Sequence, residues 1–172
     1  MLDTDYLVFD QNLLKLFETE FDYRLMHHNR NDQGPEYEMM GETSLPFVWA
    51  TVVLFRKSER ARLFFDLVGR IQRNYNYYRA LYNIRERNYR NDYAFAIANI
   101  IINGYTIDEA HNIPWPMYTI EDRIEDLRFE DDTLKLYHED RALVLPQQNI
   151  HVMDKAYLQS EKCICESAAK DP

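Results

Sequence analysis

The chain has 172 residues, 46% of them hydrophobic and 28% charged, and a formal net charge of −9. This length and composition are typical of one globular domain with a buried core, which excludes a disordered or fibrous protein. The negative charge argues against general binding to a nucleic-acid backbone, because such binding depends on Lys and Arg. With four Gly, the sequence also lacks a GxGxxG or GxxxxGK(S/T) phosphate loop.

The first 46 residues predict short elements and a long loop. Residues 7–9 form or end a buried strand, and Asp10 caps a helix over residues 11–20. The expected buried side of that helix consists of Leu13, Leu14, Leu16 and Phe17. Residues 21–28 alternate as a strand does, and the polar residues 29–46 are expected to be a loop that covers a site.

The middle of the chain carries the strongest patterns. FVWATVVLF, residues 47–55, predicts a central strand covered on both faces. Ser58 is placed to cap a long helix, whose apolar residues recur every three or four positions. The expected buried stripe comprises Ala61, Phe64, Val68, Ile71, Tyr75, Tyr78 and Tyr82. A second helix over residues 90–104 should end at Gly104.

The C-terminal part predicts a hairpin and a tail. Residues 133–138 and 141–146 are two short strands joined by the turn HEDR, and residues 161–172 are expected to be disordered. Two closely spaced cysteines, Cys163 and Cys165, are too few for a disulfide framework or a zinc site. We therefore expect a cytoplasmic protein without a transmembrane segment or signal peptide.

Strands and helices interleave along the chain, which predicts the α/β fold class with a mixed sheet flanked by helices, in a single domain over residues 1–160. The sharpest chemical feature is Asp3 and Asp5, which point to the same side if they lie in a strand. Two such carboxylates can share Mg²⁺ or Mn²⁺ and leave other positions for substrate phosphates. The simpler alternative is a solvated turn.

Four stretches, in this order, resemble segments of metal-dependent glycosyltransferases of the GT-A fold. LDTDYLVFDQNLLKLFE (2–18) is similar to their metal-binding segment, and LPFVWATVVLFRKSERARLFFDLV (45–68) to a later strand, turn and helix. YRNDYAFAIA (89–98) is similar to the acid-bearing helix start that faces the donor sugar. NIHVMDKAYL (149–158) resembles a late segment with His and Lys. The resemblance covers residues 2–158.

The resemblance implies a nucleotide-sugar donor, an unknown acceptor and a metal-binding site. Asp3 and Asp5 match the acids that hold Mn²⁺ or Mg²⁺ against the donor diphosphate, and His151 matches the third ligand. Lys155 matches the cation beside the phosphate leaving group. A metal and a lysine together neutralise the charge that builds on a departing diphosphate.

Two further positions follow from the resemblance. Asp92 matches an acid near the reacting sugar, where it acts as a general base or stabilises a cationic sugar, and Arg90 is its partner or binds phosphate. Trp49 and residues 28–46 stand where donor or acceptor contacts are expected. Each has a simpler alternative, such as a helix N-terminal acid for Asp92 or a surface lysine for Lys155.

The sequence departs from the family at its start. The nucleotide-binding half that precedes the acid-x-acid motif in these enzymes is missing before Asp3, so we expect a truncated enzyme, or one that needs a partner chain or self-association. A non-catalytic binding module derived from the same fold is the alternative. Residues 70–92 hold six Arg against Glu86 and Asp92, but Tyr75, Tyr78 and Tyr82 between them are already assigned to the core, so nucleic-acid binding is not expected.

Overall fold

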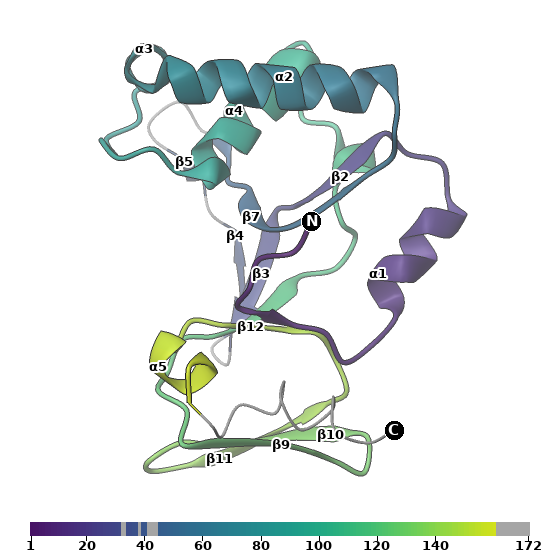
Figure 1. Cartoon of the computed structure of the whole chain (residues 1–172), viewed down its shortest axis with the longest axis vertical. Helices are drawn as coiled ribbons and strands as arrows, with labels where there is room; N and C mark the ends of the chain where they lie inside the picture. The colour runs from purple at the N-terminus through teal and green to yellow at the C-terminus, as the bar shows by residue number, and fades with distance from the viewer. Residues whose placement is uncertain (32–33, 38, 41–44, 161–172) are drawn as a thin grey trace.

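The computed structural model describes residues 1–31, 34–37, 39–40 and 45–160, which form a mixed α/β fold (Figure 1). Its centre is a five-stranded sheet in the order β1-β12-β8-β3-β4. These strands are β1 (Tyr6–Leu7), β12 (Ile150–Val152), β8 (Met117–Ile120), β3 (His28–Asn31) and β4 (Gly34–Tyr37). The inner three strands run parallel, whereas β1 and β4 are antiparallel at the edges. A mixed sheet with flanking helices, as predicted, is confirmed.

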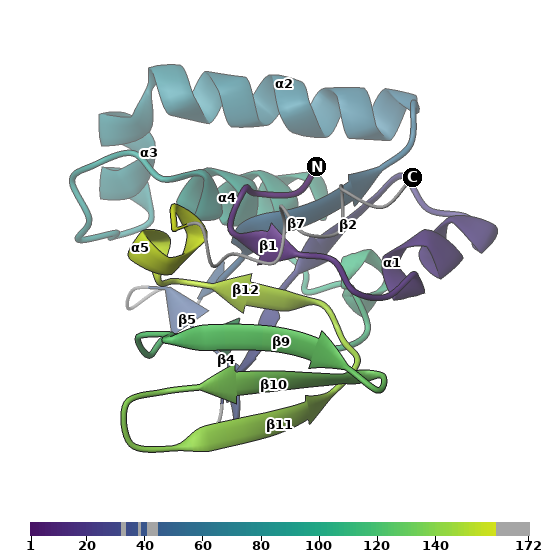
Figure 2. The same cartoon turned by 60° about the horizontal axis from the view of Figure 1, so that its bottom comes forward.

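One half of the molecule is built on a two-stranded sheet covered by helices. β2 (Tyr23–Met26) pairs with β7 (Trp49–Phe55), and α2 (Glu59–Arg73), α3 (Tyr75–Leu81) and α4 (Asn91–Ile102) lie on one side of this pair (Figure 2). Val53 packs against the helices, whereas Val52 and Leu54 face the other way, toward α1 (Asn12–Lys15) and the 3₁₀ turn η1 (Leu16–Glu18). The predicted coverage of β7 on both faces is therefore confirmed, but the predicted central position was wrong, because β7 belongs to a two-stranded sheet with β2.

The other half is a three-stranded antiparallel sheet in the order β11-β10-β9, which lies below β12 and α5 (Lys155–Leu158) in Figure 1. Its strands are β9 (Asp126–Glu130), β10 (Thr133–Tyr137) and β11 (Ala142–Pro146). Leucines of this sheet, such as Leu134 and Leu136, pack against Ile150 and Val152 of β12. The pair β5 (Met39–Met40) and β6 (Leu45–Pro46) and the 3₁₀ turn η2 (Glu109–His111) complete the described elements.

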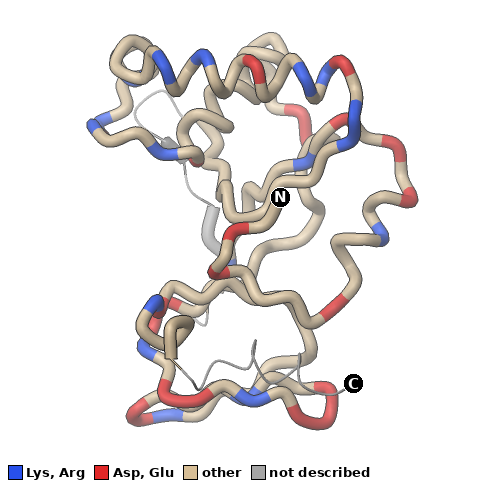
Figure 3. The backbone as a smooth tube through the Cα atoms, viewed as in Figure 1, with Lys and Arg blue, Asp and Glu red and all other residues tan. Residues whose placement is uncertain are grey.

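Charge is unevenly distributed between these halves. Residues 56–90, which span α2, α3 and the loop before α4, contain ten Lys or Arg and three Asp or Glu in a chain of net charge −9. Figure 3 shows this concentration of basic residues along α2 and the adjoining loop. Within the described residues, no helix is long and apolar enough to cross a membrane.

Local signals in the sequence placed several elements correctly. The Ser58 hydroxyl accepts a hydrogen bond from the Ala61 amide at 3.1 Å and caps α2, as predicted. After α4, Gly104 has a φ of +63°, and the amide of Tyr105 donates to the Ile100 carbonyl, which ends the helix as expected. The hairpin of β10 and β11 is also confirmed.

Other expectations were wrong. The predicted helix over 11–20 is a single α-turn followed by η1, and Leu14 and Phe17 are exposed while Leu13 and Leu16 are buried. The long helix breaks at Asn74. The described part of the predicted loop at 29–46 contains strands β3 to β6, because residues 28–31 pair with 34–37 as a hairpin. The predicted disordered tail, 161–172, lies outside the described residues.

Candidate functional site

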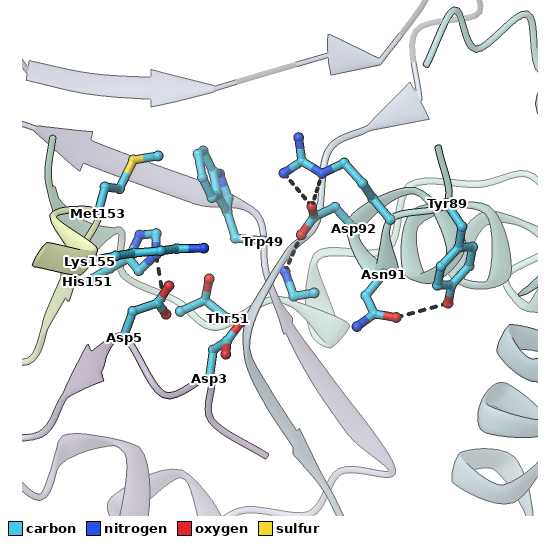
Figure 4. A pocket seen from close by; sticks show the side chains of 12 residues that line it. Asp3, Asp5, Trp49, Thr51, Tyr89, Asn91, Asp92, His151, Met153 and Lys155 are labelled. Atoms are coloured by element: carbon cyan, nitrogen blue, oxygen red, sulfur yellow. Dashed lines mark hydrogen bonds and ion pairs between the residues drawn. The ribbon is translucent and has the colours of Figure 1, made fainter. Parts of the chain in front are cut away.

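Four segments that are far apart in the sequence line one pocket of about 420 Å³, which has β7 and α4 on one side and β12 and α5 on the other (Figure 4). They are the N-terminal segment, the start of β7, the start of α4 and the segment from β12 into α5. All seven residues singled out from the sequence line this pocket: Asp3, Asp5, Trp49, Arg90, Asp92, His151 and Lys155. The volume is within the range of small-molecule sites, roughly 300–1,000 Å³.

The N-terminal segment passes from β7 to the five-stranded sheet. The Asp3 amide donates to the Thr51 carbonyl at 2.9 Å, and the Val152 amide of β12 donates to the Asp5 carbonyl at 2.9 Å. Asp3 and Asp5 therefore lie in a turn between these two attachments rather than within one strand, so the strand geometry expected for them was wrong. Both side chains nevertheless line the same pocket, because the backbone on either side of the turn is fixed.

Asp5 and His151 face each other inside the pocket. The distance between Asp5 Oδ1 and His151 Nε2 is 3.6 Å, and their side chains are 20% and 8% exposed. Asp5 Oδ1 is buried and accepts no hydrogen bond from the described residues. Such an unsatisfied carboxylate oxygen is costly unless a cation or a donor completes it.

The opposite edge of the His151 ring contacts a buried polar pair. His151 Nδ1 lies 3.2 Å from Thr119 Oγ1, and the Thr119 hydroxyl donates to Asn29 Oδ1 at 2.6 Å. Burial lowers the pKa of His151, against the opposing effects of the nearby carboxylates of Asp5, Asp3 and Asp92. The ring is therefore favoured in its neutral form, which is the form that ligates metals.

Asp92, in the first turn of α4, is hydrogen-bonded on both oxygens. Its Oδ1 accepts from the Ala50 amide at 2.9 Å, and its Oδ2 accepts from Arg90 Nε at 2.8 Å and Nη2 at 2.6 Å. The Asp92 side chain is 14% exposed, whereas Arg90 is 51% exposed. These contacts join the start of α4 to β7, so Asp92 has a structural role that does not depend on a substrate.

The remaining predicted residues lie along the wall and rim. Trp49 is partly buried, its ring lies at an angle to His151 with centroids 6.3 Å apart, and its indole nitrogen has no hydrogen-bond partner among the described residues. Lys155 is exposed at the start of α5 and extends toward the middle of the pocket (Figure 4). Within 28–46, residues 28–31, 34, 45 and 46 do not line the pocket.

The donor set fits a hard divalent cation, although the site is not a closed cage. Anywhere in the described ranges, no three His, Cys, Asp or Glu side chains converge as a complete metal-binding group. Asp5 Oδ1, which accepts no hydrogen bond from the described residues, nevertheless forms with the facing imidazole nitrogen of His151 a pair that a cation would satisfy. Mg²⁺ and similar ions are commonly held by one or two carboxylates together with substrate phosphates rather than by protein alone.

Sequence reasoning missed several residues of the site. Thr51 lines the pocket two positions after Trp49, and this spacing along a strand was a usable signal. Tyr89, Asn91 and Met153 are the other pocket residues that were not singled out, apart from Ala50. Thr119 and Asn29 carried no signal, because only the sheet register brings them to His151.

Two tyrosines in the arginine-rich residues 70–92 are packed in the core, as the sequence predicted. Tyr75 and Tyr82 are buried in the structure, at 7% and 6% exposure, and so are not available to stack on bases.

Comparisons of the chain with protein-family models, curated proteins and solved structures find no significant match. The site's geometry and the sequence motifs therefore carry the functional argument by themselves.

Proposed function

We propose that the chain is a metal-dependent glycosyltransferase of the GT-A type, which transfers a sugar from a nucleotide-sugar to an acceptor. The observation that carries this proposal is the convergence on one pocket of the seven residues that the sequence and its resemblance singled out. They come from segments separated by up to about 150 positions, so the sequence order alone did not require them to meet. Their shared location supports the resemblance as a whole better than any single motif does.

Asp5 and His151, with Asp3 on the same pocket, would hold Mn²⁺ or Mg²⁺ together with substrate phosphates rather than as a complete protein ligand set. When bound, the ion supplies Lewis-acid stabilisation to the negative charge that develops on the diphosphate leaving group. Lys155 extends into the same pocket, where its ammonium group would contact the phosphates. Burial of His151 and Asp5 strengthens such interactions, because they are screened less than exposed charges are.

Asp92 and Arg90 form the opposite wall, where the sugar and the acceptor would lie. Because Arg90 and the Ala50 amide fix the carboxylate, Asp92 presents a stationary negative charge to the reacting sugar. A positioned carboxylate of this kind orients an acceptor hydroxyl or stabilises positive charge at the anomeric carbon. The indole of Trp49, between the two walls, offers an apolar face, while its buried nitrogen has no hydrogen-bond partner among the described residues.

The second candidate is a binding module that holds the nucleotide-sugar without transferring the sugar. The occupation of both Asp92 oxygens by hydrogen bonds favours this alternative, since a carboxylate paired with arginine is a weaker base. The two candidates share metal and diphosphate binding, and they differ in turnover. Release of nucleoside diphosphate from a panel of nucleotide-sugars with Mn²⁺ distinguishes them, because only a transferase cleaves the bond to the sugar.

The metal and diphosphate site is tested by calorimetry with Mn²⁺ and a panel of nucleoside diphosphates. Asp3→Asn and Asp5→Asn keep the shape of each side chain and remove its charge, so both should weaken Mn²⁺-dependent binding at least tenfold. Asp66→Asn, on the exposed face of α2, changes the net charge equally and is the matched control. Equal heats for all four proteins would rule out a role of these acids in binding.

A further inference from the structure

Three buried polar side chains form a chain of contacts across the parallel strands of the central sheet. As whole residues, Asn29 on β3, Thr119 on β8 and His151 on β12 are 0%, 1% and 6% exposed. His151 and Thr119 are direct partners in the parallel pairing of β12 with β8, and β3 is the next strand. This row of contacts ends at the pocket, where His151 Nε2 faces Asp5.

The direction of these hydrogen bonds follows from counting protons. A threonine hydroxyl has one proton, and Thr119 gives it to Asn29 Oδ1, a carbonyl-type oxygen that only accepts. With this orientation of the Asn29 amide, which leaves Asn29 Nδ2 without a hydrogen-bond partner among the described residues, the imidazole is the donor in the contact between Thr119 Oγ1 and His151 Nδ1. A neutral ring with its proton on Nδ1 has a lone pair on Nε2, and this atom is directed at the pocket.

We infer that Thr119 and Asn29 are positioning residues, which hold His151 in the Nδ1-protonated tautomer so that Nε2 is ready to ligate a cation. Hydrogen bonds behind a ligating histidine fix its tautomer and ring orientation in this way. The value of this tautomer to the site rests on the proposed metal-dependent function. The tautomer itself is a property of the chain without metal.

The experiment uses ¹⁵N-histidine-labelled protein at about pH 8, where imidazoles are neutral. Long-range ¹H–¹⁵N spectra separate the protonated from the unprotonated ring nitrogen, and a His151→Gln sample assigns the signals. His27 is an internal reference, because its Nδ1 lies 2.8 Å from the Phe47 carbonyl, which can only accept. In the unsubstituted chain we expect His151 protonated on Nδ1, as for His27.

Thr119→Val removes the hydroxyl at nearly constant volume, and Thr119→Ser is the matched control that keeps it. We expect Thr119→Val to shift His151 toward the Nε2-protonated tautomer and to weaken Mn²⁺ binding by about 10–100-fold, the usual effect of losing such a partner. Thr119→Ser should retain both the tautomer and most of the affinity. His27 should be unchanged in every variant.

Two results would overturn the inference. One is an Nε2-protonated His151 in the unsubstituted chain, which corresponds to a reversed Asn29 amide and needs no variant to detect. The other is an unchanged tautomer in folded Thr119→Val. Failure of the proposed function has a different signature, since the unsubstituted chain would then show the Nδ1-protonated tautomer but no Mn²⁺ binding.

Discussion

Replacement of Asp92 separates its structural role from its proposed role in transfer. Asp92→Ala removes the charge-assisted hydrogen bond from the Ala50 amide, which contributes about 1.5–3 kcal/mol. It also removes the ion pair with Arg90, which contributes about 0.2–1 kcal/mol because Arg90 is half exposed. The sum predicts a loss of about 2–4 kcal/mol in the free energy of unfolding. For a chain of this size, that corresponds to a drop of roughly 5–15 °C in melting temperature.

The isosteric change Asp92→Asn is the informative comparison. Its amide oxygen can still accept from the Ala50 amide, whereas its NH₂ group faces the Arg90 donors, so we expect a loss of only about 1–2 kcal/mol. Urea titration gives the stability, and nucleoside diphosphate release from the nucleotide-sugar panel gives the turnover. If the melting temperature of Asp92→Ala lies within 1–2 °C of that of the unsubstituted chain, then Asp92 does not stabilise the fold by connecting α4 to β7. If Asp92→Asn retains full turnover, its proposed role beside the sugar is wrong.

Two further predictions concern stability. Phe64 is fully buried and stacked on Tyr23, with 4.4 Å between ring centroids, so Phe64→Ala should lower the free energy of unfolding by about 3–5 kcal/mol. Leu14 is 65% exposed, so Leu14→Ala should lower it by less than about 0.5 kcal/mol in the same urea titration. Burial lowers the pKa of His27 to about 4, so between about pH 6.5 and 4 the unfolded chain binds a proton at this residue that the folded chain does not bind. The free energy of unfolding should therefore fall by roughly 3 kcal/mol as the pH falls from about 6.5 to 4. His27→Asn should flatten this part of the pH profile of stability.

The sequence predicted the elements whose signals are local. Ser58 and Gly104 mark the start of one helix and the end of another, because capping needs only a few neighbouring residues. The strand at 49–55 was evident from its β-branched residues. The buried side of the first helix was misjudged, because one turn followed by a 3₁₀ turn does not keep the 3.6-residue period on which the expectation relied.

The candidate site was predictable as a set of residues but not as a geometry. The acid-x-acid motif singled out Asp3 and Asp5, and the family resemblance added His151, yet nothing local indicated that Asp3 is attached to one sheet and Asp5 to the other. The contact of Thr119 with Asn29 spans 90 positions. A buried Asn and a buried Thr in two strands have no meaning for function until the register between those strands is known.

The N-terminal segment is attached to both β7 and β12, so the distance between its two carboxylates depends on how these two parts of the molecule lie relative to each other. Asp3 is hydrogen-bonded to β7, whereas Asp5 is hydrogen-bonded to β12 and so to the sheet that β12 joins. Any hinge rotation of one half against the other therefore changes the distance between these carboxylates. A ligand that contacts both acids would clamp the halves together, and its binding would slow amide hydrogen exchange at the Asp3 and Val152 amides at the same time.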